Sequence, residues 1–140
     1  HLGKTLISAY LNGELPLEIK EEFESEFSTS RNEILDSVYK KACPNRYLSN
    51  FATFLSPRIH DQHIRFMVSN CFLEFINKRI KIFDNFEQQK LRCVGSIAFQ
   101  FKEVLAECAL ASEIELDVID QHPIDKLFAN IINGQLTSNI

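Results

Sequence analysis

The residue pattern best suited to chemistry is a glycine–serine pair at the end of a short apolar run. Residues 90–95 (KLRCVG) are typical of a strand that ends in Gly95-Ser96, and a helical pattern starts at Ile97 with no loop between. In an α/β sheet this arrangement points free backbone N–H groups at the carboxyl edge, where ligands bind. Because glycine has no Cβ, a flat ring or a phosphate can approach the main chain at Gly95. A structural alternative fits equally well: Gly95 permits the turn and Ser96 caps the helix.

A second candidate is a metal site formed by His60 and His63. The spacing of three residues places two histidines on one helix face, but Asp61 is a plausible helix N-cap and His60 precedes the helix. No third and fourth ligand follow at a spacing known for zinc. We therefore interpret both histidines as structural.

The cysteines are the third candidate. Cys43, Cys71, Cys93 and Cys108 are scattered, no CxxC occurs, and three of them lie in apolar segments. This usage predicts reduced thiols in a cytoplasmic protein. Cys43, just before a proline break, is the one candidate nucleophile, but only a few basic neighbours would lower its pKa. The structural interpretation is favoured for all four.

The bulk composition excludes several classes of partner. The chain has 140 residues, 45% of them hydrophobic, with 15 basic and 19 acidic residues and a net charge of −4. Without a basic block, binding to nucleic acid is not expected. No apolar stretch approaches the roughly 20 residues of a membrane span, and no signal peptide is present, so we expect no membrane association. Because residue 1 is His and not Met, we expect a piece of a longer protein.

The first 89 residues predict helices only. Apolar residues recur every three or four positions, with stop and start signals between them. Asn12-Gly13 is a helix stop, and Pro16 suits the first turn of the next helix, which has an acidic face that we interpret as solvated. Ser30 and Glu33 form a predicted capping box. A break at Pro44 precedes a short helix.

The longest predicted helix runs from His63 to about Phe83, with Asp61 as its N-cap. Its apolar stripe is wide enough to face a core on more than one side, and we expect its phenylalanines to be packed inside. The stripe consists of Ile64, Val68, Cys71, Phe72, Phe75, Ile76, Ile80 and Phe83.

Residues 90–140 change to an alternating pattern. A strand at 90–95 is followed by a helix from Ile97 to about Ala111, a second strand in the stretch EIELDVIDQ, and a closing helix over 122–135. Strand, helix, strand, helix predicts two neighbouring parallel strands joined by a crossover helix. Because two strands alone are marginal, we expect the remaining strands upstream of His1.

Four stretches, HLGKTLISAYLNGELP, PNRYLSNFATFL, VGSIAFQFKEVLAE and HPIDKLF, carry a family resemblance. In this order and spacing the chain resembles the C-terminal part of BadF/BadG/BcrA/BcrD-type ATPases, and most of all their N-acetylglucosamine-kinase-like bacterial members. These belong to the actin-like ATPase and sugar kinase superfamily. The resemblance implies an α/β, ribonuclease-H-like domain fragment that is helix-rich with a partial parallel sheet. Residues 1–140 would be the C-terminal portion of the ATPase domain, with a helical part (1–89) and a strand–helix–strand–helix part (90–140).

The resemblance also implies a site for ATP. Leu2-Gly3-Lys4 resembles the end of the family's second phosphate loop, which would place Gly3 near the phosphates. Val94–Ile97 resembles the adenosine loop. Gly95 and Ser96 would contact adenosine through backbone and hydroxyl groups, with Ile97 and Ala98 alongside. Catalytic residues and Mg²⁺ ligands would lie upstream, so the segment alone is expected to be inactive. The match at Pro44-Asn45-Arg46 has no assigned role.

The function implied is that of an ATP-dependent kinase for N-acetylglucosamine or a related amino sugar. Two alternatives stay open. One is an ATPase that activates a radical dehydratase, which would need cysteines for an iron–sulfur cluster. The other is a non-catalytic helical interaction module. Neither the sugar nor the oligomeric state follows from the sequence, and a homodimer is one of the options.

Overall fold

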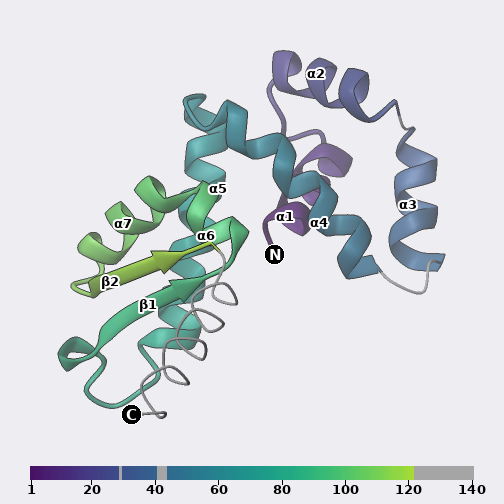
Figure 1. The fold of residues 1–140 in the computed structure, drawn as a ribbon. Helices are drawn as coiled ribbons and strands as arrows, with labels where there is room; N and C mark the ends of the chain where they lie inside the picture. Colours follow the sequence, from purple (N-terminus) through teal and green to yellow (C-terminus); the bar gives the residue numbers. More distant parts are fainter. Residues whose placement is uncertain (29, 41–43, 122–140) are drawn as a thin grey trace, which may run out of the picture. The chain divides into compact units, whose positions relative to one another are not determined.

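A computed structural model describes residues 1–28, 30–40 and 44–121 (Figure 1). At 38–40 and 44–46 only the backbone is described. The chain divides into two units, His1–Phe75 and Ile76–Ile140. The expected closing helix over 122–135 lies outside the described residues. The division after residue 89 and the assignment to the C-terminal portion of an ATPase domain stay predictions.

The first unit is helical, as the sequence predicts. Its elements are α1 (Leu2–Asn12), α2 (Leu17–Phe27), α3 (Arg31–Lys40), α4 (Pro44–Leu55), the 3₁₀ turn η1 (Ser56–Arg58) and α5 (Gln62–Phe75). Gly13 ends α1 in a left-handed conformation with φ 73°. The capping box before α3 is confirmed, because the Ser30 N–H donates to Glu33 Oε2 at 2.7 Å and the Glu33 N–H donates to Ser30 Oγ at 3.3 Å. Asp61 caps α5, accepting from the Ile64 N–H at 2.9 Å.

Phe23 on α2 is the centre of the core of this unit. It is fully buried, with the rings of Tyr10, Phe27, Phe51 and Phe54 at centroid distances of 4.8 to 5.6 Å. Tilted and edge-on aromatic pairs at this separation are favourable beyond their burial. The cluster therefore holds α2 against α1 and α4.

Arg58 corrects the expectation that the acidic side of α2 is only a solvated face. Its Nε and Nη2 groups pair with Glu22 at 2.5 Å and Glu26 at 3.0 Å. Its Nη1 group donates to the Phe54 carbonyl at 2.9 Å, and the guanidinium lies 3.7 Å above the Phe54 ring. Glu22 and Glu26 thus tie α2 to the end of α4, and a third glutamate of α2, Glu24, accepts a hydrogen bond from the Tyr10 hydroxyl.

Helices α1 and α4 approach each other at Gly3. This glycine is buried, and a Cβ built on it would lie 1.8 Å from the backbone oxygen of Leu48. A backbone atom cannot rotate away as a flexible side chain can. The contact between the two helices therefore requires glycine at position 3.

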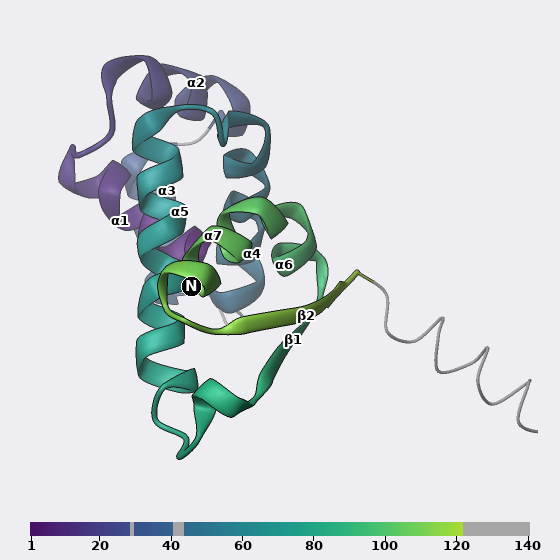
Figure 2. The same cartoon turned by 90° about the vertical axis from the view of Figure 1, so that its left-hand side faces the viewer.

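The second unit carries the strands. After the π-helical turn η2 (Ile76–Ile80) and the 3₁₀ turn η3 (Phe86–Gln88), it contains β1 (Lys90–Val94), α6 (Ser96–Gln100), α7 (Lys102–Ala111) and β2 (Glu115–Asp120). The strands are parallel, which confirms the predicted crossover. Helices α6 and α7 lie on one side of the two strands (Figures 1 and 2). The predicted single helix is wrong in one respect, because Phe101 (φ −109°, ψ 28°) interrupts it and is itself buried.

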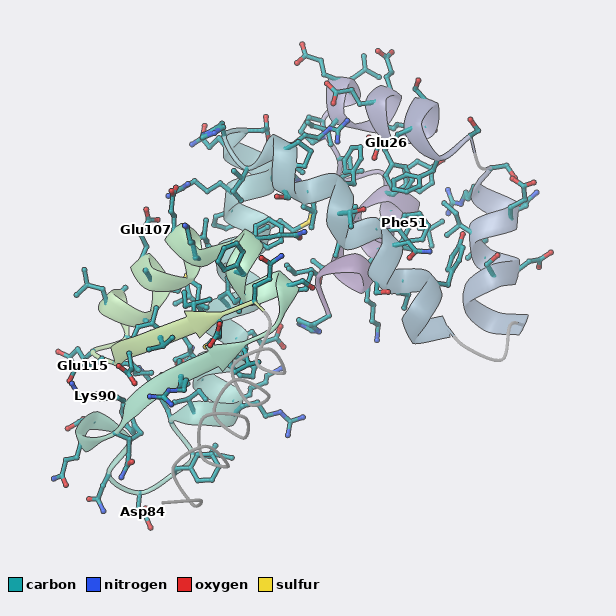
Figure 3. The ribbon with its side chains drawn as sticks, viewed as in Figure 1. Glu26, Phe51, Asp84, Lys90, Glu107 and Glu115 are labelled. Atoms are coloured by element: carbon teal, nitrogen blue, oxygen red, sulfur yellow. The ribbon has the colours of Figure 1, made fainter. Side chains whose placement is uncertain are left out.

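One face of the strand pair is polar. Lys90 pairs with Glu115 at 2.5 Å, and the two side chains lie together in Figure 3. Arg92 pairs with Asp117 at 2.8 Å. The register slips between Leu91 and Cys93, so Arg92 stands opposite two residues of β2. This exposed ion-paired face differs from central parallel strands, which are apolar on both faces.

The longest helix only partly follows its prediction. Ile64, Val68, Cys71 and Ile76 are buried as expected. Phe66 is 66% exposed, Phe75 is 44% exposed and Phe83 is 63% exposed, so the expectation that its phenylalanines are inside is wrong for these three. The π-helical turn at 76–80 has a wider period than an α-helix, which rotates the following residues off the apolar stripe.

The contact at Gly3 predicts the effect of a small substitution. Gly3→Ala in the full-length protein should lower the unfolding free energy by about 1–3 kcal/mol, because overpacking outweighs the higher helix propensity of alanine. Urea unfolding measures the change. Ser8→Ala, at an exposed position of the same helix, is the matched control and should not destabilise. A Gly3→Ala variant as stable as this control would contradict the described packing.

Candidate functional site

The turn after β1 is built on the backbone of Gly95. Its dihedral angles, φ 119° and ψ 162°, fall in a region that essentially only glycine occupies. Gly95 occupies the N-cap position of α6, and Ser96 is the first helical residue. The alternative that Gly95 permits the turn is therefore confirmed, and the expectation that Ser96 caps the helix is wrong.

The turn is fastened to the end of β2. The Gly95 N–H donates to the Asp120 carbonyl at 2.8 Å, so the expectation of a free N–H group is wrong at this residue. The Gly95 carbonyl accepts from the Phe99 N–H at 3.1 Å, which closes the first turn of α6. The N–H groups of Ser96, Ile97 and Ala98 occupy the first turn, where an α-helix offers them no acceptor of its own. Gly95 is thus held between the end of β1, which it follows directly, and the end of β2, to which its N–H is bonded.

The surface around Gly95 is open and apolar. Within the described residues, a Cβ added to Gly95 would meet no atom within 4 Å, so among these residues its dihedral angles require the glycine and crowding does not. Val94 before it is 52% exposed, and Phe99 one helical turn later is 38% exposed. The Lys102 ammonium lies 5.3 Å from the centroid of the Phe99 ring. Exposed apolar side chains beside a bare backbone suit a flat apolar ring better than a phosphate.

The other predicted residues fall into two groups. Ser96 is exposed, and Ile97 and Ala98 are half-buried, so the structure brings all three next to Gly95. Gly3 belongs to the other unit, and its packing on Leu48 accounts for a glycine there without any ligand. Val94 lies within the Val94–Ile97 stretch that the sequence singled out, whereas sequence reasoning missed Phe99 as part of this surface. The signal for Phe99 was present, since it is apolar and follows Gly95 by four residues, about one helical turn.

The cysteines in the described part of the chain do not provide a nucleophile. Cys71, Cys93 and Cys108 form no disulfide. Burial raises the pKa of the Cys71 thiol, which also donates a hydrogen bond to Thr5 Oγ1 at 3.3 Å. Burial likewise raises the pKa of Cys93. Cys43 lies outside the described residues.

The described part of the chain contains neither a cluster of metal-ligating side chains nor a helix suited to a membrane. Among residues 1–28, 30–40 and 44–121, no three or more His, Cys, Asp or Glu side chains come together as a metal site, so His60 and His63 find no further ligand there. Within the same ranges, no helix combines the length and the apolar character needed to cross a bilayer.

Comparison with known proteins gives one informative result. No protein-family model matches the chain, and no curated protein matches it. Among solved structures, a protein from Porphyromonas gingivalis, provisionally identified as an N-acetylglucosamine kinase, is similar with a TM-score of 0.88 and 28% sequence identity. The similarity covers 96% of this chain and 47% of the other. The chain has a kinase-like fold and spans about half the length of that structure.

The raised thiol pKa values predict slow alkylation. Cys93 in the folded full-length protein should react with iodoacetamide more slowly than in urea, and its rate should still climb above pH 9, because less thiolate is present at each pH. Mass spectrometry of the Cys93 peptide across a pH series measures the rate. The same peptide in urea is the control. A rate that levels off below pH 8 would contradict the burial described for this thiol.

Proposed function

We propose that the chain is the C-terminal ATPase-domain portion of an ATP-dependent sugar kinase that phosphorylates N-acetylglucosamine or a related amino sugar. We place the kinase among the N-acetylglucosamine-kinase-like BadF/BadG/BcrA/BcrD-type ATPases, with a ribonuclease-H-like fold. The observation that carries the proposal is the likeness to the Porphyromonas gingivalis structure, at 28% identity over nearly the whole chain. The resemblance of the sequence motifs points to the same group. The protein would act in the cytoplasm.

The Gly95 turn is the proposed binding site for the adenosine of ATP. Its open side offers no steric barrier, and Val94 and Phe99 supply apolar surface for a purine. The Ser96 hydroxyl would form a hydrogen bond with the nucleoside, and Ile97 and Ala98 would line this binding site. In the other unit, Gly3 at the start of α1 would lie near the phosphates. Helix N-termini favour anions, and this supports the assignment.

The chemical step is proposed to belong to the part of the protein upstream of this chain. Phosphoryl transfer depends almost wholly on positioned charge around the phosphates. Val94, Ser96 and Phe99 beside Gly95 supply apolar surface and one hydroxyl, which suit a nucleoside better than phosphoryl transfer. Mg²⁺ would be held mainly by upstream carboxylates, and the ion would neutralise the developing charge on the phosphates. This portion would bind and orient the nucleoside.

A substitution at Gly95 tests the proposal in the full-length enzyme. Gly95→Asp should raise the KM for ATP about tenfold or more, which equals a loss of about 1.4 kcal/mol of binding. The side chain would occupy the open space and bring a negative charge towards the nucleotide. The KM for the amino sugar should stay unchanged. Steady-state kinetics with ATP and N-acetylglucosamine measure both constants.

Gly13→Asp is the matched control. Gly13 also has a positive φ and nothing within 4 Å of an added Cβ, but it ends α1 and has no proposed ligand. The KM of the Gly13→Asp enzyme for ATP should equal that of the unmodified enzyme. An unchanged KM for ATP in a folded Gly95→Asp enzyme would refute the proposed adenosine site.

Two further measurements on the full-length protein address the alternative functions. If Mg-ATP does not shift its melting temperature, the non-catalytic module is favoured. If it contains bound iron after anaerobic preparation, the dehydratase activator is favoured.

A further inference from the structure

The two parallel strands leave their regular register at one point, shortly before the Gly95 turn. Leu91 pairs with Leu116 and Val94 pairs with Asp120, so β2 holds one residue more than β1 between these two pairs. Bulges are rare between parallel strands, and they are frequent beside active sites. The irregularity is therefore a candidate functional feature of the strand pair.

The bulge interrupts the backbone hydrogen bonding between the strands. We call Arg92, with Asp117 and Val118 opposite it, the β2 bulge. A bulge leaves one residue without a backbone partner on the facing strand. Two paired positions then follow before the turn, Cys93 with Ile119 and Val94 with Asp120. A paired segment this short opens more readily than a continuous ladder, so the bond from the Gly95 N–H to β2 depends on what else holds the strands together there.

An ion pair joins the two strands at the bulge itself. The Arg92 Nη2 group donates a hydrogen bond to Asp117 Oδ2 at 2.8 Å. A second ion pair on the same two strands, Lys90 with Glu115, lies in the regular part of the ladder and farther from the turn. The Arg92–Asp117 pair is thus placed to hold β2 against β1 where the backbone bonding is interrupted.

We propose that Arg92 and Asp117 are positioning residues for nucleotide binding, because their ion pair holds the end of β2 in place and so maintains the Gly95 turn. With the bulge held, the Asp120 carbonyl lies 2.8 Å from the Gly95 nitrogen. A displacement of about 1 Å would lengthen that contact beyond hydrogen-bond range and release the φ of 119° at Gly95. The link to nucleotide rests on the adenosine site proposed above.

The expected effect is modest, because the pair is exposed. The Arg92 side chain is 67% exposed and that of Asp117 is 35% exposed, so water screens their attraction. An exposed ion pair changes an equilibrium by about two- to fivefold. This range sets the size of the changes that the variants should show.

Hydrogen–deuterium exchange of the full-length protein without nucleotide tests whether the ion pair holds the turn. Arg92→Asp and Asp117→Arg each set like charges against each other at the bulge, so the peptide that contains Gly95 should exchange about two- to fivefold faster. The double variant restores an opposite-charge pair and should exchange at the unmodified rate. Lys90→Glu, which opposes like charges in the regular part of the ladder, is the matched control and should leave this peptide unchanged.

Steady-state kinetics of the same full-length variants test the role in nucleotide binding. Each single variant should raise the KM for ATP about two- to fivefold, with kcat and the KM for N-acetylglucosamine unchanged, and the double variant should restore it. Arg92→Asp and Asp117→Arg change the charge in opposite directions, so a direct effect of charge on the anionic nucleotide would raise one KM and lower the other. Lys90→Glu makes the same charge change as Arg92→Asp and should leave the KM for ATP unchanged.

Four results would overturn the proposal. Unchanged exchange of the Gly95 peptide in both single variants would show that the ion pair does not hold the turn, and a double variant no better than its parents would show the same. KM values for ATP that move in opposite directions would indicate a direct effect of charge. Faster exchange with an unchanged KM for ATP would separate the turn from nucleotide binding.

The Gly95→Asp variant identifies what has failed in that last case. A raised KM for ATP in Gly95→Asp leaves the proposed adenosine site in place and overturns only the positioning role of Arg92 and Asp117. An unchanged KM for ATP in Gly95→Asp overturns both the adenosine site and the positioning role.

Discussion

The proposed nucleoside site depends on one hydrogen bond between the Gly95 turn after β1 and the end of β2. The Gly95 N–H donates to the Asp120 carbonyl, and this fixes a backbone conformation that essentially only glycine adopts. Because the turn is held from β2, α6 can begin at once and leave the bare backbone facing open space. A side chain at this position would strain the turn and fill that space. The turn and the proposed nucleoside contact would thus both require glycine at position 95, so the residue type alone does not distinguish a structural role from a binding role.

The two glycines singled out in the sequence illustrate two different physical reasons for glycine. Gly3 is required because the Leu48 carbonyl lies where a Cβ would be, whereas Gly95 is required by its dihedral angles and has no described atom within 4 Å of an added Cβ. Only the second arrangement leaves room for a ligand within this chain. The proposed contact of Gly3 with phosphates therefore depends on the helix N-terminus, and the proposed contact of Gly95 with adenosine depends on the open turn itself.

Local signals in the sequence predicted much of the fold. The stop at Gly13, the capping box of Ser30 and Glu33 and the cap at Asp61 involve neighbours in sequence, and all are confirmed. The parallel strands followed from the alternation of elements. The exposure of Phe83, the break at Phe101 and the pairing of Arg58 with α2 were missed. They depend on a π-helical turn, on packing and on residues more than 30 positions apart, which periodicity does not encode.

A crystal structure of the full-length protein with a non-hydrolysable ATP analogue and N-acetylglucosamine would test the central claim most directly. We expect the purine to lie in van der Waals contact with the Cα of Gly95, at about 4 Å, with Val94 or Phe99 against the ring. The hydrogen bond from the Gly95 N–H to the Asp120 carbonyl should persist in the complex. A purine bound elsewhere, or a Gly95 turn filled by side chains from the rest of the protein, would contradict it.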